Sequence, residues 1–349
     1  MARSRAYGEK SVHDVSTIGP GRAARQDDPA PQGSLSSGDC GRLVGESPVM
    51  RALTSYLLRV ASSDTNVLIT GGTGTGKEIA AELIHANSAR RHRLFTRINC
   101  PAIPETLIES ELFGYERGSF TGADSARDGM MTVGNGGTVF FDEIGDLSLS
   151  AQAKILRAVE TKEVNRLGSK SSIPVDVRIL AATNRDLDRL VGEGTFRQDL
   201  YFRLNVARIH LPRLKERKED IPRLCHHYVE MFNRKCHQSV EGFTDEVLER
   251  LIRYEWPGNV RELRNLIEVS FVSALPRLIS LADLPESFRK RLDETEQLPA
   301  DERERLVSTL LATKWNKSEA ASKLHWSRMT LYRKMAKYGI PIGKYLEAH

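Results

Sequence analysis

The sequence predicts an α/β domain built on a parallel sheet, then a small helical lid and an all-α domain with a helix-turn-helix. Between residues 42 and 212, apolar runs such as VLIT at 67–70 and TVFF at 138–141 alternate with stretches of helical spacing, which is typical of parallel βαβ units. Beyond Pro212, apolar residues recur only at helical spacing. Two short helical patterns then adjoin between residues 316 and 340.

These patterns divide the chain into five expected segments. Residues 1–41 are rich in Gly, Ser, Pro, Asp and Arg without apolar periodicity, so we expect a disordered tail. The α/β domain is expected over 42–212, with a third strand-like run at 175–183. The lid follows over 213–288, with helices expected at 220–235, 244–254 and 259–275. The charged stretch 289–304 is expected to be a solvated linker, followed by the helix-turn-helix domain over 305–349.

Composition excludes several classes of protein. The chain of 349 residues is 40% hydrophobic and 28% charged, and no apolar run approaches the roughly 18 residues that span a bilayer, so we expect a cytoplasmic protein with no membrane partner. The four cysteines contain no CxxC pair, so neither a disulfide framework nor a zinc site is indicated. We interpret them as buried thiols: Cys40, Cys100, Cys225 and Cys236.

Residues 71–78, GGTGTGKE, fit a phosphate-binding loop and lie directly between an apolar strand and a helical stretch. Glycines let backbone N–H groups surround a phosphate, and the following helix adds its positive dipole. Lys77 supplies a charge to the β- and γ-phosphate oxygens. Glu78 stands where Ser or Thr normally helps to bind magnesium, so the metal must depend on Thr75, water or a downstream acid. The expected cradle is Gly71, Gly72, Thr73, Gly74, Thr75, Gly76, Lys77 and Glu78.

The downstream acids follow the strand-like run TVFF, as Asp142 and Glu143. We expect Asp142 to hold Mg²⁺ directly or through water, and Glu143 to polarise the attacking water. Asn184 follows the next strand, where it can sense the γ-phosphate or hold the water. Alone, these motifs also suit a Gly-rich turn, an acidic helix cap and a turn asparagine. Their combination in this order favours a site for ATP and Mg²⁺.

The segment FRQDLYFRL at 196–204 places Arg197 and Arg203 near one another on a predicted short helix. Arginines contributed across a subunit interface can neutralise transition-state charge. A pair of surface salt bridges explains them equally well.

The C-terminal segment is basic: residues 313–349 hold eight Lys/Arg against two Glu, a net charge of +6. The two expected helices cover 317–324 and 328–337, and Ser327 suits the N-cap of the second. Leu331 and Met335 are expected to pack inward. The opposite face can enter a major groove with Arg328 or Arg333 on bases, although basic amphipathic helices are often simply solvated. That face comprises Ser327, Arg328, Thr330, Arg333, Lys334 and Lys337. A dimer face is expected in the preceding segment, at Leu306, Leu310 and Leu311.

From about Leu43 to Leu284 the sequence resembles the AAA+ central domain of bacterial sigma-54-dependent activators, also called enhancer-binding proteins. The segments that carry this resemblance are LVGESPVM (43–50), GGTGTGKE (71–78), ESELFGYERGSFTGA (109–123), GGTVFFDEIGDL (136–147), FRQDLYFRLNV (196–206), LPRLKERKEDI (211–221) and WPGNVREL (256–263). The C-terminal helices resemble the Fis-type DNA-binding domain. The residues before Leu43 are too few for the sensory domain that many members carry.

The resemblance implies roles for particular residues. GxxGxGKE is the form of the phosphate loop in this family, so Glu78 is no sign of inactivity. Asn99 would orient Glu143, Arg261 would sense nucleotide from the lid, and Arg197 with Arg203 would act on a neighbouring subunit, which requires a ring, expected to be a hexamer. The loop that grips the sigma factor would be Gly118, Ser119, Phe120, Thr121, Gly122 and Ala123, with Phe120 and Thr121 in contact and Ser119 where Ala is usual.

The expected function is therefore an ATPase that binds upstream enhancer DNA and drives open-complex formation by the sigma-54 RNA polymerase holoenzyme. The alternative is a DNA-binding regulator whose nucleotide-binding domain mainly controls assembly or needs a partner subunit. A DNA motor or a metabolic kinase would need tracking loops or a substrate pocket that the sequence does not indicate. Control is expected to come from an inhibitor or co-activator protein, from the expression level, or not at all.

Overall fold

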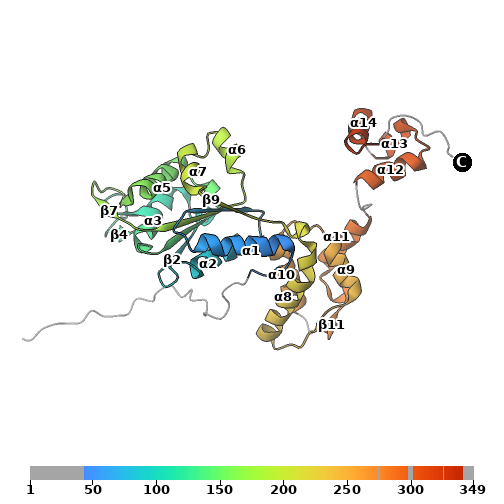
Figure 1. Ribbon diagram of the computed structural model, residues 1–349, viewed down its shortest axis with the longest axis horizontal. Helices are drawn as coiled ribbons and strands as arrows, with labels where there is room; N and C mark the ends of the chain where they lie inside the picture. The colour runs from blue at the N-terminus through green and yellow to red at the C-terminus, as the bar shows by residue number, and fades with distance from the viewer. Residues whose placement is uncertain (1–42, 273–275, 298–301, 325, 341–349) are drawn as a thin grey trace, which may run out of the picture. The chain divides into compact units, whose positions relative to one another are not determined.

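The computed structural model describes residues 43–272, 276–297, 302–324 and 326–340, so the expected tail at 1–41 and Cys40 lie outside the described residues. The centre of the first domain is a five-stranded parallel sheet in the order β2-β5-β8-β1-β9 (Figure 1). Its strands are β1 (Val67–Gly71), β2 (Phe95–Asn99), β5 (Thr138–Asp142), β8 (Arg178–Thr183) and β9 (Ala207–Leu211). The expected α/β class is confirmed.

Helices cover both faces of this sheet because neighbouring side chains of a buried strand point to opposite sides. Leu68 belongs to the core that includes α3 and α5, whereas Val67 and Ile69 belong to the core formed with α1 and α2. Figure 1 shows α1 and α2 on one side of the sheet, and α3, α5 and α7 on the other. The bounds are α1 Pro48–Ala61, α2 Lys77–Ala86, α3 Glu105–Phe113, α5 Leu149–Thr161 and α7 Gln198–Leu204.

Smaller elements decorate the sheet domain. Two antiparallel pairs are formed by β3 (Gly114–Tyr115) with β4 (Arg127–Asp128) and by β6 (Glu163–Asn165) with β7 (Ser172–Pro174). Two short helices are α4 (Met130–Val133) and α6 (Leu187–Gly192). The β3–β4 pair supports the loop that contains Phe120.

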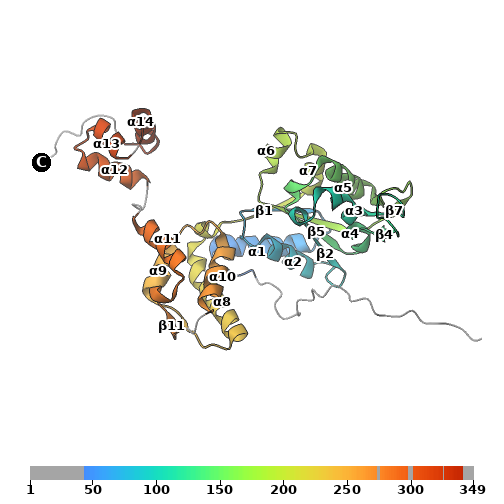
Figure 2. The same ribbon diagram turned by 180° about the vertical axis from the view of Figure 1, so that it is seen from behind.

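The lid contains α8 (Ile221–Cys236), α9 (Asp245–Arg253), α10 (Asn259–Ser270) and α11 (Glu286–Gln297) around a core of their apolar faces. The helices α8 and α10 lie side by side in both views (Figures 1 and 2). Trp256 is buried in this core between Tyr254 and Phe288. A short parallel pair, β10 (Gly242–Phe243) with β11 (Leu278–Ile279), was not expected from the sequence.

Two expected boundaries in the lid are wrong. The helix expected over 259–275 ends at Ser270, and residues 273–275 lie outside the described residues. The expected linker at 289–304 is helical over 289–297, as part of α11. Leu292 packs in the lid core one turn after Phe288. These two residues form the apolar face of an otherwise highly charged helix, which is why the composition suggested a linker. Residues 298–301, also assigned to the linker, lie outside the described residues.

The C-terminal domain consists of α12 (Glu302–Ala312), α13 (Lys317–Lys323) and α14 (Arg328–Lys337) with a core of its own. The Ser327 hydroxyl accepts a hydrogen bond from the Thr330 backbone N–H at 3.1 Å, as expected of an N-cap. Leu331 and Met335 are fully buried, which confirms their inward packing. Leu306 and Leu310 are also in the core, so the expected dimer face is wrong for these two; Leu311 is 60% exposed.

The interpretation of the cysteines as buried thiols is confirmed for Cys100 and Cys225, and burial raises the pKa of each to about 12. It is wrong for Cys236, which is exposed at the end of α8. Among the described helices, none combines the length and the hydropathy needed to cross a membrane.

Arg178, at the start of β8, fastens the end of α1 to the sheet. The side chain is 1% exposed, and its guanidinium donates to the carbonyl oxygens of Val60 (2.9 Å), Ala61 (3.1 Å) and Thr65 (3.2 Å). Burial lowers the pKa of this guanidinium. Because the last carbonyls of a helix have no partner within the helix, this one side chain satisfies groups that α1 cannot.

We expect Arg178→Met to lower the free energy of unfolding by about 3 kcal/mol, because it leaves buried carbonyls without donors. The matched control is Arg189→Met, which removes an exposed i,i+4 pair with Glu193 and is expected to leave stability nearly unchanged. Urea unfolding of both variants measures the difference. Equal losses would show that the three buried hydrogen bonds contribute no more than a surface ion pair.

Candidate active site

The loop from Gly71 to Gly76 leaves β1 and enters α2 at Lys77. Gly74 (φ +76°) and Gly76 (φ +102°) have the left-handed backbone that glycine adopts without steric cost. A Cβ atom on Gly74 would also lie 2.4 Å from the carbonyl oxygen of Gly258 in the lid. The loop is therefore packed directly against the lid, and its glycines allow both the turn and this contact.

A chain of polar contacts joins the loop to the ends of two strands. Lys77 is buried; its ammonium donates to the Gly71 carbonyl at 3.2 Å and lies 3.1 Å from Glu143 Oε1. The other oxygen of Glu143 accepts from the Asn184 backbone N–H at 2.7 Å, and the Asn184 amide donates to Thr73 Oγ1 at 2.9 Å. The structure thus brings together five of the residues predicted from sequence, in a single network.

The backbone of Glu143 is itself unusual. Its φ of +55° is in the left-handed region, which costs a residue with a Cβ atom about 1–2 kcal/mol. This turn directly follows β5 and directs the carboxylate to Lys77.

Asp142 ends β5 and is half-buried. Burial raises the pKa of its carboxyl, and the adjacent charge of Glu143 adds to the shift, while Lys77 opposes it. A carboxylate held against these penalties favours a nearby cation. No group of three or more His, Cys, Asp or Glu in the described part of the chain forms a metal cage. Mg²⁺ commonly takes only one or two carboxylates together with phosphate oxygens and water, so this acid pair fits it.

Thr75 and Glu78, which flank the Gly76–Lys77 pair in the sequence, have other partners. Thr75 is buried, and its hydroxyl donates to the Gly72 carbonyl at 2.9 Å. The Glu78 carboxylate accepts from Arg97 of β2 at 2.9 Å.

A cavity of about 250 Å³ lies beside this network. Its polar part comes from the glycine loop, Lys77, Asp142 and Glu143, and the lid supplies Tyr228, Val260, Arg261 and Arg264. Ile79, Tyr228 and Val260 give this mostly polar cavity a smaller apolar part. A charged end suited to phosphates and apolar side chains suited to a planar base are the two features that a nucleotide requires.

Asn259 connects the lid to the glycine loop and was missed by the sequence analysis. It is buried, with φ +51°, and its amide donates to the Thr73 carbonyl at 2.9 Å while its oxygen accepts from the Leu214 N–H at 2.8 Å. The Arg261 N–H also reaches the Gly74 carbonyl at 3.3 Å. The available signal was an Asn after Gly258 at the start of a helix, since Asn tolerates a left-handed backbone.

Within the described part of the chain, three predicted site residues make no contact with the Lys77–Glu143–Asn184 network. Arg197, just before α7, pairs with Asp199 at 2.7 Å, and Arg203 pairs with Glu160 at 2.9 Å; neither lines the cavity. Asn99 ends β2 in register with Asp142 and is exposed. The oxygens of Glu143 are held by Lys77 and Asn184 in this arrangement, not by Asn99.

The GSFTGA loop projects between β3 and β4. The Gly118 N–H donates to the Ala123 carbonyl at 2.9 Å and closes the neck, and Gly118 (φ +80°) and Gly122 (φ +97°) provide its left-handed turns. Phe120 is 43% exposed, and its ring meets the edge of Tyr115 at a centroid distance of 4.9 Å. Thr121 is exposed as well, Ser119 is half-buried beside Gly168, and Ala123 is buried.

The predicted DNA-binding face is only partly exposed. Ser327, Arg328 and Arg333 are exposed, whereas Thr330 is half-buried with its hydroxyl 2.8 Å from that of Ser327. The half-buried Lys334 places its ammonium 4.7 Å from the Trp326 ring. Lys337 ends α14, and its side chain lies outside the described residues. Met329 (79% exposed) and Tyr332 form an i,i+3 pair on this helix that was not predicted from the sequence.

The chain matches three protein families in succession. Residues 43–210 match the sigma-54 interaction domain, residues 215–301 the AAA+ ATPase lid domain, and residues 298–338 the Fis family of bacterial regulatory proteins.

Similar proteins have the same organisation over most of this chain. The transcriptional regulatory protein ZraR of Escherichia coli K12 is 45% identical over 301 residues, which cover 84% of this chain and 68% of ZraR. The regulatory protein AtoC of the same strain is 39% identical, covering 88% and 70%. Among solved structures, NtrX of Brucella abortus in complex with ATP superposes with a TM-score of 0.67 at 30% identity, covering 85% of this chain and 70% of NtrX.

We expect Asn259→Ala to lower the free energy of unfolding by about 3 kcal/mol, because a Cβ-bearing residue is strained at this backbone and two buried groups lose their partners. Asn259→Gly is expected to lose less, about 2 kcal/mol, because glycine removes the strain but not the lost hydrogen bonds. Asn265→Ala, an exposed position in the same helix, is the control and should change stability little. Urea unfolding measures all three; an order in which Gly is no better than Ala would exclude the backbone contribution.

Proposed function

Because this chain belongs to the sigma-54-dependent family of transcription regulators, with AAA+ and Fis-type DNA-binding domains, we propose that it hydrolyses ATP in a ring of its own copies to remodel the sigma-54 RNA polymerase holoenzyme. The observation that carries the proposal is the contact of Lys77 with Glu143 at 3.1 Å beside the cavity. Lys77 would bind phosphate and Glu143 would polarise water, and here the two neutralise one another. A bound triphosphate would come between them.

In this proposal the loop Gly71–Glu78 binds the phosphates of ATP, whose negative charge competes with Glu143 for Lys77. Glu143 is then free to accept a proton from the attacking water. Asn184, which bridges Thr73 and Glu143, would respond to the γ-phosphate. Asp142 would hold Mg²⁺, which when bound neutralises charge on the β- and γ-phosphate oxygens.

Ring assembly would complete the site. Arg197 and Arg203 lie at the surface outside their own cavity, so they are available to a neighbouring copy once their exposed pairs with Asp199 and Glu160 open. Solvent screens exposed pairs of this kind, so opening them costs little free energy and such an exchange is feasible. Arg261 of the lid would contact the phosphates from within the same chain. We propose that the ring is a hexamer.

The sigma factor would be gripped by Phe120 and Thr121. The chain runs from Asn99 at the end of β2 through α3 to this loop, so a hydrogen bond from Asn99 to Glu143 would link the nucleotide state to the loop by a short path. The glycines at the neck allow the loop to change direction, and Phe120 supplies apolar area to a partner. Work on RNA polymerase would place the protein in the cytoplasm.

Upstream enhancer DNA would be bound by α14 in the major groove, through Ser327, Arg328, Thr330, Arg333, Lys334 and Lys337. The exposed Met329 adds an apolar contact suited to a thymine methyl group.

We expect Glu143→Ala to lower ATP turnover at least about 100-fold, since it removes the general base, and to abolish open-complex formation on a sigma-54 promoter. Thr121→Ala should retain turnover and fail to open the promoter, because only the partner contact is changed. Turnover and heparin-resistant open complexes are measured in parallel on wild type and both variants. If wild type hydrolyses ATP and opens no promoter, the alternative of an assembly-controlled DNA-binding regulator, or one that needs a partner subunit, replaces this proposal.

We expect Arg333→Ala to weaken binding to a duplex selected from a random pool by the wild type, by roughly tenfold, as for loss of one base or phosphate contact. Lys323→Ala, which removes an exposed i,i+4 pair with Glu319 on α13, is the control. Fluorescence anisotropy at two salt concentrations measures both variants. Equal affinities for the two variants would remove Arg333 from the interface.

A further inference from the structure

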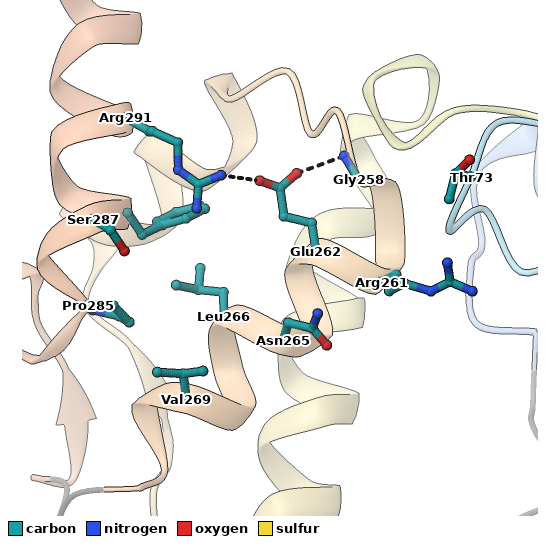
Figure 3. A pocket seen from close by; sticks show the side chains of 11 residues that line it. Thr73, Gly258, Arg261, Glu262, Asn265, Leu266, Val269, Pro285, Ser287 and Arg291 are labelled. Carbon is teal, nitrogen blue, oxygen red and sulfur yellow. Dashed lines mark hydrogen bonds and ion pairs between the residues drawn. The ribbon is translucent and has the colours of Figure 1, made fainter.

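A second cavity, which we call the lid groove, lies between α10 and α11 (Figure 3). It has a volume of about 440 Å³ and is lined on its apolar side by Leu266, Val269, Pro285 and Phe288. Val269 is 53% exposed, although it belongs to the central helix of the lid. Apolar side chains that line an open groove favour an apolar occupant.

The groove has a preformed shape. At one rim, the Glu262 carboxylate accepts from the Gly258 N–H at 2.9 Å and from Arg291 at 2.8 Å, as the dashed lines in Figure 3 show. The Arg291 guanidinium also lies 4.9 Å from the centre of the Phe288 ring. These contacts tie α11 to the start of α10, so the groove does not depend on an occupant to stay open.

The lid groove adjoins the nucleotide cavity. Thr73, Arg261 and Asn265 line both, and Thr73 and Arg261 lie at the same end of the groove in Figure 3. An occupant of the groove therefore reaches the glycine loop and the arginine of the lid that faces the phosphates.

An exposed apolar side chain of suitable size occurs on α7. Phe202 is 62% exposed, and its ring lies tilted against that of Tyr201 at a centroid distance of 5.6 Å. It directly precedes Arg203, and it does not line the groove of its own chain. A large apolar side chain held in water next to a functional arginine is typical of a protein interface.

We propose that Phe202 of one copy inserts into the lid groove of the next copy in the ring. The occupant is a second copy of this chain because the two features have matching neighbours: Phe202 adjoins Arg203, and the groove adjoins Arg261 and the nucleotide cavity. Insertion brings Arg203 to the mouth of that cavity. Phe202 is thus a positioning residue that sets how far the arginines reach. This inference rests on the proposed ring and on its use of Arg197 and Arg203.

The first test measures assembly. Phe202→Ala should raise the protein concentration for half-assembly with ATP by roughly tenfold or more, since it removes a buried aromatic side chain from each contact. The melting temperature of the unassembled chain should not change, because Phe202 is exposed there. Phe202→Leu should restore most of the assembly. Leu94→Ala, another exposed large apolar position on the sheet domain, is the control. Assembly that is unchanged in Phe202→Ala overturns the inference.

The second test locates the contact by disulfide cross-linking. Chains carrying Phe202→Cys are mixed with chains carrying Val269→Cys, all in a background with Cys40→Ser and Cys236→Ser; Cys100 and Cys225 are buried and remain. With ATP, at a protein concentration above the half-assembly value of Phe202→Ala, we expect a covalent dimer between the two kinds of chain. The control pairs Phe202→Cys with Val272→Cys, which is exposed just beyond α10 and does not line the groove. Cross-links of equal yield to both positions contradict a specific contact.

The outcomes separate this inference from the proposed function. If the mixed chains assemble and hydrolyse ATP without a link between residues 202 and 269, the groove contact is wrong and the ring ATPase stands. If Val269→Cys in the dilute, unassembled chain resists a thiol reagent, a segment of the same chain fills the groove and the inference is wrong. If wild type neither assembles nor hydrolyses ATP, both fail.

Discussion

The close packing of the glycine loop against the first turn of α10 is the contact on which the site depends. Gly74 faces the Gly258 carbonyl with no room for a side chain, and the Asn259 amide donates to the carbonyl of Thr73. This contact joins the phosphate-binding loop to the lid. The two domains therefore share the loop as a common surface, and a change in its backbone alters the position of Arg261 as directly as that of Lys77.

The architecture was largely predictable because its signals are local. The strands β1 and β5 follow apolar runs, α8 and α14 follow helical spacing, and the glycine loop lies where strand passes to helix. The wrong predictions concern segments whose composition suggests a solvent-exposed role but whose apolar side chains pack in a core. Residues 289–297 are highly charged, yet Leu292 packs in the lid core and Arg291 and Asp293 pair with other lid residues. Leu306 and Leu310 look like an interface in sequence but fill a small domain core.

The site was predictable by residue type and less so by geometry. Lys77, Glu143, Asn184 and Thr73 were each expected, but the sequence does not reveal that they form one hydrogen-bonded chain. Asn259 escaped because its role depends on a backbone angle and on partners 45 and 186 residues away. The exposure of Phe202 escaped for a similar reason, since an aromatic residue in an apolar helix pattern is normally buried.

The left-handed backbone at Glu143 has a consequence for how this sequence can change over time. Glycine would relax that turn, and asparagine would tolerate it. The backbone of this turn therefore accepts most easily two residues that abolish the carboxylate and with it the ion pair of the buried Lys77. Selection for stability of the turn then favours a residue that tolerates the left-handed backbone, whereas selection for function favours the carboxylate. A copy of the gene released from its regulatory task would be expected to lose the acid here early, while the surrounding structure remains intact.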